Sequence, residues 1–276
     1  MVIHLIDGTY ELYRHFYGQR SFNKGKDKPY GAVVGVLNSV LQMIEEGATH
    51  VGVATDHVIE SFRNELWPGY KTGEGIERPL FMQFHPLEDA LTSMGVVVWP
   101  MVDLEADDAL ASAAHLAAAD PQVIKVCIWT PDKDLAQCVR EDRVVQIDRR
   151  AKVIRDEAGV RKKFGVSPLL IPDFLALVGD SADGYPGISG IGSVGAAKLL
   201  NQYGPIEDFP KTLLVGQRKE ALLFKHLATL RTDAPLFDDA DQLRWRGPTA
   251  GFAILAEKFG EPRLLARAQA AAKDLK

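Results

Sequence analysis

Carboxylate side chains cluster at the ends of the predicted strands of this chain. Asp7 ends the first apolar run and Asp56 follows the second, while the later motifs EADD, PDKD and GDSAD each bring two or three acids together. The candidate ligands are Asp7, Asp56, Glu105, Asp107, Asp108, Asp132, Asp134, Asp180 and Asp183. Because parallel strands end at the same edge of a sheet, we expect the first seven of these acids to converge there, with Asp180 and Asp183 closing the group from the helical part.

A cluster of this kind predicts a site for divalent cations. Like charges a few ångströms apart raise each other's pKa values, and bound cations relieve that repulsion. Oxygen ligands without a cluster of His or Cys favour Mg²⁺ or Mn²⁺ over zinc. Two such ions about 4 Å apart form an arrangement that cleaves phosphodiesters, one ion activating water and the other stabilising the leaving oxygen. Helix capping remains an alternative interpretation for Glu105 and Asp134 taken singly.

The segment GIGSVG at residues 190–195 matches the pattern GxGxxG. A dinucleotide site would need a strand before this segment and an acid about 20 residues after it. Here a predicted helix precedes the segment and no predicted strand follows. A second interpretation is a helix–turn–helix whose backbone N–H groups hold a DNA phosphate, with Lys198 as a further contact. A purely structural turn is the third.

Alternating patterns place these residues on an α/β scaffold. Apolar runs predict strands at residues 2–6, 50–54, 95–99 and 123–129. Helical spacing predicts helices at 30–46, 105–119, 171–178, 194–203, 218–230 and 252–259. We therefore predict a mostly parallel central sheet with helices on both faces in residues 1–165, followed by a helical part in residues 166–276.

Composition narrows the class of protein. The chain has 276 residues, 46% of them hydrophobic, and a net charge of −5, which excludes disorder and a fibrous repeat. Two cysteines, no leader segment and no long apolar stretch favour a reduced, cytoplasmic protein without a membrane helix. Without the nine clustered acids the remaining charge is +4. Nine basic residues within 140–163 could face a phosphate backbone or simply be solvated.

Together these motifs resemble the bacterial 5′-nuclease family, which comprises the 5′–3′ exonuclease domain of DNA polymerase I and stand-alone flap endonucleases. The matching stretches, in the family's order, are LIDGTYELYR, SFRNELWPGYK, LEADDALAS, TPDKDLAQ and LVGDSADGYPGISGIG. The resemblance covers nearly the whole chain and weakens after about Leu236. It implies a PIN-like α/β core with two metal ions, a helix-three-turn-helix that grips DNA, and cleavage near the junction of a 5′ single strand with a duplex.

The resemblance also implies roles for single residues. The first metal site is Asp7, Asp56, Glu105, Asp107 and Asp108, and the second is Asp132, Asp134, Asp180 and Asp183, with Asp107 or Asp108 shared. Lys71 matches a lysine that faces the scissile phosphate, and the expected catalytic set is Lys71, Asp107, Asp108 and Asp132. The expected DNA contacts are Arg14, Arg63, Tyr70, Lys71, Gly190, Gly192 and Lys198. Carbonyls of Gly187, Ile188 and Gly190 could bind K⁺. Structural roles stay open for Arg14, as the partner of an acid, and for Tyr70, as a half-buried aromatic.

Several positions depart from the family's pattern. Glu74 stands where a basic residue is usual, and an acid there repels an approaching phosphate, although Arg78 could substitute. Gly184 replaces a common asparagine, and Thr55 replaces an aromatic residue. The short segment 71–87 makes a long helical arch for threading 5′ flaps doubtful.

We therefore predict a metal-dependent 5′-nuclease that acts on DNA in replication or repair, as a monomer, with a separate polymerase and ligase as partners. One alternative is an RNase of the PIN type. The other is a junction-binding module that cuts DNA weakly or not at all because of Glu74.

Overall fold

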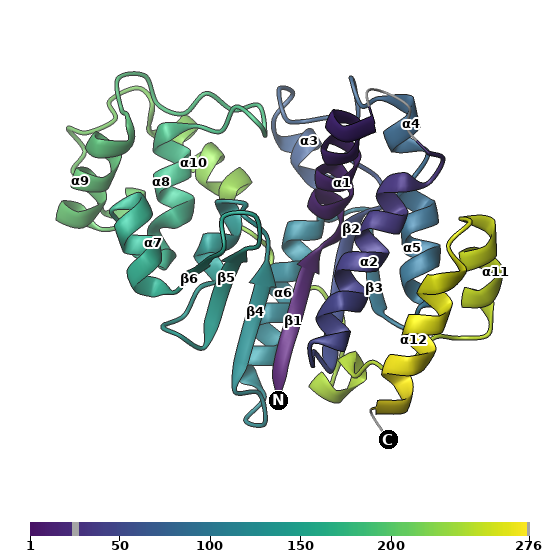
Figure 1. Cartoon of the computed structure of the whole chain (residues 1–276). Coiled ribbons are helices and arrows are strands. Elements are labelled where there is room, and N and C mark those ends of the chain that lie inside the picture. Colours follow the sequence, from purple (N-terminus) through teal and green to yellow (C-terminus); the bar gives the residue numbers. More distant parts are fainter. Residues whose placement is uncertain (24–27, 275–276) are drawn as a thin grey trace.

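A twisted sheet organises the first part of the chain in the computed structural model, which describes residues 1–23 and 28–274 (Figure 1). Its strands are β1 (Val2–Asp7), β2 (His50–Asp56), β3 (Val97–Met101), β4 (Lys125–Trp129), β5 (Val144–Asp148) and β6 (Val153–Arg155). The strand order is β3-β2-β1-β4-β5-β6, and every pairing is parallel except that of β5 with β6. The predicted mostly parallel sheet is confirmed, whereas β5 and β6 were not predicted.

Helices cover both faces of this sheet. One face packs against α1 (Gly8–Asn23), α2 (Gly31–Glu45) and α5 (Phe84–Ser93), and the other against α6 (Ala106–Ala119). The alternation of side chains along β1 explains this division. Ile6 lies in the core shared with α2, while Ile3 and Leu5 lie in the core shared with α6. These two layers fix the ends of β1, β2 and β4 in space.

A second group of helices has its own apolar core and forms the left side of Figure 1. It contains α7 (Glu157–Phe164), α8 (Ile171–Val178), α9 (Ser193–Tyr203) and α10 (Arg218–Ala228). Short 3₁₀ helices lie at Asp134–Cys138, Pro168–Leu170 and Ile206–Asp208. The predicted helical part after residue 165 therefore forms, and it is built around buried side chains such as Leu177 and Phe224.

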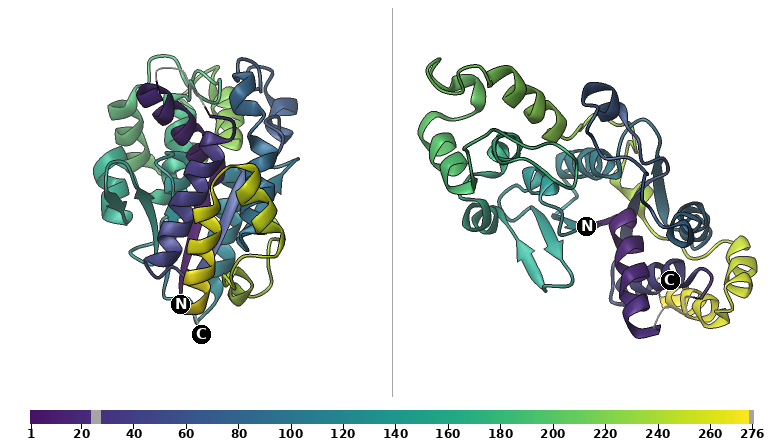
Figure 2. Two further views of the ribbon diagram at one scale, coloured as in Figure 1. Left: turned by 45° about the vertical axis from the view of Figure 1, so that its right-hand side comes forward. Right: turned by 90° about the horizontal axis from the view of Figure 1, so that it is seen from above.

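The end of the chain does not stay with this helical group. After a 3₁₀ helix at Ala240–Leu243, helices α11 (Gly251–Lys258) and α12 (Pro262–Asp274) pack against α2 and α5 at the opposite end of the molecule (Figures 1 and 2). Phe252 and Leu264 join the core of the sheet's α2 face, and Trp245 Nε1 donates to Met94 O at 2.8 Å. The prediction of one helical domain over 166–276 is wrong for its last part, because the amphipathic helices α11 and α12 bury their apolar faces on the α/β part.

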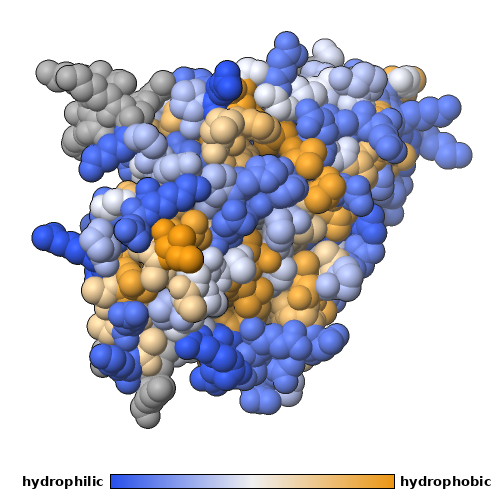
Figure 3. All heavy atoms as spheres, turned by 90° about the vertical axis from the view of Figure 1, so that its right-hand side faces the viewer, coloured by the Kyte–Doolittle hydropathy of each residue, from blue (hydrophilic) through white to orange (hydrophobic). Residues whose placement is uncertain are grey.

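The segment that leads into α5 is compact. It contains α3 (Phe62–Leu66) and the four-residue α4 (Arg78–Phe81). No long helix spans residues 67–83, all of which the structure describes. On the face shown in Figure 3, hydrophilic side chains cover most of the surface, with apolar ones between them. No helix among the described residues has the length and apolarity to cross a membrane.

Candidate active site

The ends of the central strands form the floor of a pocket of about 450 Å³. Asp7 is the last residue of β1 and Asp56 the last of β2, while Asp132 follows β4. Because β1 lies between β2 and β4, the strand order reverses there, which is where open α/β sheets bind ligands. The pocket lining includes Asp7, Asp56, Lys71, Glu105, Asp107, Asp132 and Asp183. Six of the nine predicted acids therefore meet at this edge.

Hydrogen bonds from the backbone hold the acids at the strand ends. Asp7 accepts from the backbone N–H of Tyr10 at 2.8 Å and from the Thr130 hydroxyl at 3.0 Å. Asp56 accepts from the N–H of Ala106, the first residue of α6, at 2.8 Å. These bonds satisfy N–H groups at the starts of α1 and α6, and both carboxylates line the pocket.

Two further predicted acids, Asp134 and Asp180, form a second group with Asp183 beside the pocket. Ligand oxygens of Asp134, Asp180 and Asp183 lie within 4.8 Å of one another, and all three residues are buried. One oxygen of Asp134, Oδ1, is buried without a hydrogen-bond partner. Lys133 forms an ion pair with Asp180. Lys133 was not predicted from the sequence, although its position between Asp132 and Asp134 was the available signal.

Burial and mutual repulsion raise the pKa values of Asp7, Asp107 and Asp134. The pKa of Asp7 rises to about 7, chiefly because of burial, with added repulsion from Asp56 and Asp132. Burial followed by neighbouring carboxylates raises the pKa values of Asp107 and Asp134 well above their usual range. Without a cation, the edge of the sheet therefore retains protons that isolated carboxylates would lose.

Lys71 bridges the two groups of acids. Its Nζ lies 2.7 Å from Glu105 Oε2 and 3.1 Å from Asp183 Oδ1, and 30% of its side chain is exposed to the pocket. Burial opposes its charge, but Glu105 and Asp183 raise the pKa of Lys71 well above its usual value. The same contacts lower the pKa of Glu105, whose burial alone would raise it. A fixed positive charge therefore faces the pocket.

The loop that carries Asp183 is pinned to the segment that carries Lys71. The Lys71 N–H donates to Asp183 O at 3.0 Å, and Trp67 Nε1 donates to Gly184 O at 3.0 Å. Gly184 has a φ of +85°, and a Cβ there would lie 1.9 Å from Gly69 O. The glycine that replaces the family's asparagine is therefore required by this close approach of two backbones.

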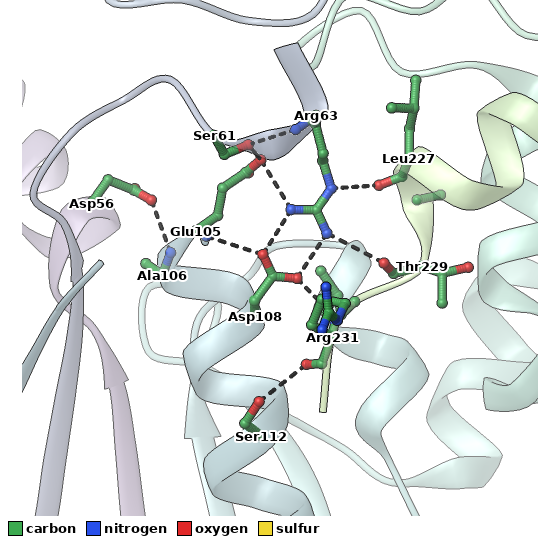
Figure 4. A network of polar contacts seen from close by, with 12 residues as sticks. Asp56, Ser61, Arg63, Glu105, Ala106, Asp108, Ser112, Leu227, Thr229 and Arg231 are labelled. Atoms are coloured by element: carbon green, nitrogen blue, oxygen red, sulfur yellow. Dashed lines mark hydrogen bonds and ion pairs between the residues drawn. The ribbon is translucent and has the colours of Figure 1, made fainter. Parts of the chain in front are cut away.

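Arg63 is buried behind the site and does not face it (Figure 4). Its guanidinium donates twice to Asp108 at 2.7 Å, once to Glu105 at 3.0 Å, and to Leu227 O at 2.8 Å and Thr229 O at 3.2 Å. With 1% of its surface exposed, Arg63 cannot reach a phosphate. The predicted DNA contact is wrong, because Arg63 joins α3 and α6 to the chain that leaves α10.

Asp108 belongs to the same buried network. It is 0% exposed, and besides Arg63 it accepts from the backbone N–H groups of Glu105 at 3.0 Å and Arg231 at 2.9 Å. This placement contradicts its predicted role as a metal ligand or catalytic residue. Its neighbour Asp107 lines the pocket instead, since consecutive helical residues point in different directions.

Two further predicted DNA contacts, Tyr70 and Arg14, differ in their exposure. Tyr70 is 4% exposed, and its hydroxyl donates to Glu105 Oε2 at 3.3 Å, so it is not available to stack on bases as predicted. Arg14 pairs with Glu11, with Nη2 2.5 Å from Oε2, yet its side chain stays 28% exposed. It lines a second pocket together with Arg149 and Arg150 of the turn between β5 and β6.

The glycine-rich loop connects α8 to α9, so the helix–turn–helix interpretation agrees with the structure and the dinucleotide interpretation does not. Gly192 is the N-cap of α9, Gly190 is exposed with a φ of +84°, and Lys198 is exposed on the helix. Gly187 and Ile188 are buried, and the carbonyl of Ile188 accepts from the Ile191 N–H at 3.0 Å.

Comparison with known proteins gives matches over almost the entire chain. Residues 2–165 match the family model of the 5′-3′ exonuclease N-terminal resolvase-like domain, and residues 166–251 match that of the 5′-3′ exonuclease C-terminal SAM fold.

Two curated relatives and one solved structure illustrate these matches. The 5′-3′ exonuclease of Buchnera aphidicola is 35% identical over 248 residues, which are 83% of this chain and 81% of that protein. DNA polymerase I of Pseudomonas aeruginosa is 34% identical over 260 residues, which are 87% of this chain but 28% of that protein. The bacteriophage T5 D15 flap endonuclease, in a complex with DNA and metal ions, has the same fold, with a TM-score of 0.67 at 17% identity over 98% of this chain and 100% of that chain.

Proposed function

The chain belongs to the 5′-3′ exonuclease family, and from this premise we propose that it hydrolyses DNA phosphodiesters at or near 5′ ends and single-strand–duplex junctions with the help of two Mg²⁺ ions, for which Mn²⁺ can substitute. The observation that carries this proposal is the convergence of carboxylates at one edge of the sheet. Six of them line the pocket, and Asp134 and Asp180 join Asp183 beside it.

The residues at this edge fit divalent cations. Asp134 Oδ1 is buried without a hydrogen-bond partner, and the pKa values of Asp7, Asp107 and Asp134 are raised by burial and by one another. Each of these features is relieved by a cation held between carboxylate oxygens. We assign one ion to Asp7, Asp56, Glu105 and Asp107, and the other to Asp132, Asp134, Asp180 and Asp183. Asp107 is placed to be shared, because the charges of Asp7, Asp132 and Asp134 all act on it.

The bound cations would neutralise phosphate charge and make water a better nucleophile. The protein's own contribution is position and a fixed charge. Lys71 Nζ projects into the pocket between the two groups of acids, and Glu105 and Asp183 hold it there in its charged form. A lysine at this place stabilises negative charge as it develops on the scissile phosphate.

Two surfaces outside the acidic pocket suit a DNA backbone. The exposed start of α9 offers N–H groups near Gly190 and Gly192, with Lys198 one turn along. Arg14, Arg149 and Arg150 line a second pocket of about 830 Å³. These contacts would hold phosphates without reading base sequence. A K⁺ ion at the carbonyls of Gly187, Ile188 and Gly190 remains a prediction, as do the monomeric state, the cytoplasmic location and a separate polymerase and ligase.

The nuclease proposal is tested with a 5′-flap DNA duplex labelled at either end. In Mg²⁺ we expect cutting near the junction, with none in EDTA, and the product sizes separate exonuclease from endonuclease activity. Asp132→Asn should abolish cutting and leave DNA binding largely unchanged. Asp142→Asn, which makes the same chemical change at an exposed loop residue, should cut normally. A fully active Asp132→Asn protein would contradict the metal assignment.

Two alternatives are separated by related measurements. A matched RNA substrate that is cut faster than DNA would favour an RNase of the PIN type. Binding without cutting in both Mg²⁺ and Mn²⁺ would favour the junction-binding module. Glu74 is exposed and lies three residues after Lys71. If repulsion between Glu74 and the phosphate prevents cutting, Glu74→Arg would then restore it.

A further inference from the structure

A cluster of nitrogen and oxygen ligands lies beside the predicted catalytic edge, separate from its carboxylates. His57 is the first residue after β2, and His85 and Glu88 lie on the first turns of α5, which packs against β2. One ligand atom from each of the three side chains lies within 4.8 Å of the other two. Because His85 and Glu88 are three residues apart on a helix, they point to the same side.

The carboxylate in this cluster is buried and has little positive charge near it. Glu88 is 8% exposed, its Oε2 lies 2.8 Å from His57 Nδ1, and its Oε1 accepts from the Thr55 hydroxyl at 2.8 Å. Within the described ranges 1–23 and 28–274, no lysine or arginine forms an ion pair with Glu88. A buried acid of this kind is stabilised by a cation.

The ligand set differs in kind from that of the catalytic edge. Two imidazoles with one carboxylate are typical of zinc and similar borderline metals, whereas an all-oxygen set favours Mg²⁺. We propose that His57, His85 and Glu88 bind one transition-metal cation of the Zn²⁺ class, with solvent completing the coordination. These residues lie far apart along the chain, so the sequence alone did not reveal them as a cluster.

Two features of the surroundings fit this role. The Thr55 hydroxyl holds the second oxygen of Glu88, as partners of ligating carboxylates commonly do. His85 is exposed, and the centroid of its ring lies 4.2 Å from that of His57, so the two imidazoles are already neighbours. The bound metal would clamp the end of β2, which carries Asp56, to the start of α5.

Cobalt is a suitable probe, because Co²⁺ with imidazole ligands in a four- or five-coordinate site absorbs visible light strongly, whereas octahedral Co²⁺ among carboxylates and water absorbs weakly. Protein without an affinity tag is titrated with Co²⁺ in excess Mg²⁺, which occupies the oxygen sites. We expect one strongly absorbing Co²⁺ per chain, displaced by Zn²⁺, and a higher Tm in Zn²⁺. This test does not depend on the nuclease activity, so the two proposals can fail separately.

Variants decide where the metal binds. His85→Ala changes an exposed residue and should lose the absorbing Co²⁺ and the Zn²⁺-dependent rise in Tm, as should Glu88→Gln. His115→Ala, a control at another exposed histidine, should keep both. Absence of the absorbing species in the unaltered protein, or its retention in His85→Ala, would overturn the proposal.

Discussion

Replacement of Arg63 by Met should damage folding stability far more than DNA affinity. Arg63 makes five hydrogen bonds at 1% exposure, and its loss leaves Asp108 buried and without a charged partner. The breaking of a buried ion pair by removal of one partner typically costs about 3–5 kcal/mol. Two backbone carbonyls, those of Leu227 and Thr229, lose their donor as well, so the upper end of this range is expected.

The free energy of unfolding is measured by urea denaturation, followed by tryptophan fluorescence and by circular dichroism. The control is Arg161→Met, the same substitution in a surface pair with Glu157 whose arginine side chain is 54% exposed. Such pairs contribute about 0–1 kcal/mol, so the control should stay near the unaltered protein. Adding Asp108→Asn to Arg63→Met removes the unpaired buried charge. The double variant should therefore be less destabilised than the sum of the two single variants.

A small loss of stability combined with a large loss of DNA affinity would refute the structural role of Arg63. If Arg63→Met lost less than about 1 kcal/mol of stability while its affinity for DNA fell at least tenfold, Arg63 would be a phosphate contact after all. If the Arg63→Met protein fails to fold, Arg63→Lys can be measured in its place. It keeps the charge but not the paired hydrogen bonds, and should show an intermediate loss of stability with DNA affinity little changed.

Three further predictions concern the pocket and its loops. Lys71→Met should lower the single-turnover cleavage rate by about 100- to 1000-fold, as loss of one stabilising donor does, with a smaller effect on DNA binding measured in Ca²⁺. In EDTA, the Tm should fall as the pH rises from about 4 to about 7. The reason is that the pKa of Asp7 is raised to about 7 in the folded protein, so folded Asp7 holds a proton that the unfolded chain has released. A Tm that stays flat or rises over this range would contradict the assigned burial of Asp7, and added Mg²⁺ should diminish the dependence of Tm on pH. Gly184→Asn should lower the Tm measurably, because its Cβ would collide with Gly69 O; an unchanged Tm would show that the two loops can separate at no cost.

The α/β part of the fold was largely predictable from local patterns. Apolar runs with β-branched residues located β1 to β4, because strands buried on both faces carry continuous apolar sequence. β6 has only three residues at the edge of the sheet, and two of its side chains are exposed, so no such signal marks it. The return of α11 and α12 to the sheet was not predictable, because an amphipathic helix does not specify which apolar surface covers it.

The candidate site was predictable to the level of a cluster but not to that of individual roles. Strand ends and acid positions predicted that Asp7, Asp56 and Asp132 would meet. The motif EADD could not show that Asp107 enters the pocket while Asp108 turns away, since that depends on the rotation of α6. Arg63 was assigned to DNA from the resemblance, because it lies on the same segment as Lys71. Its partners Leu227 and Thr229 come from a distant part of the chain, so the sequence did not reveal its burial.

The buried network around Arg63 gives the site a rigidity that does not depend on bound cations. Arg63 joins Glu105, a pocket residue, to the chain that leaves α10, while Lys71 joins the same glutamate to Asp183 in the helical part. These contacts are either buried or span the pocket. They therefore hold acids from the two parts of the molecule at a fixed separation. Because this geometry is set in advance, we expect cations to replace the protons held by the acids with little reorganisation of the backbone.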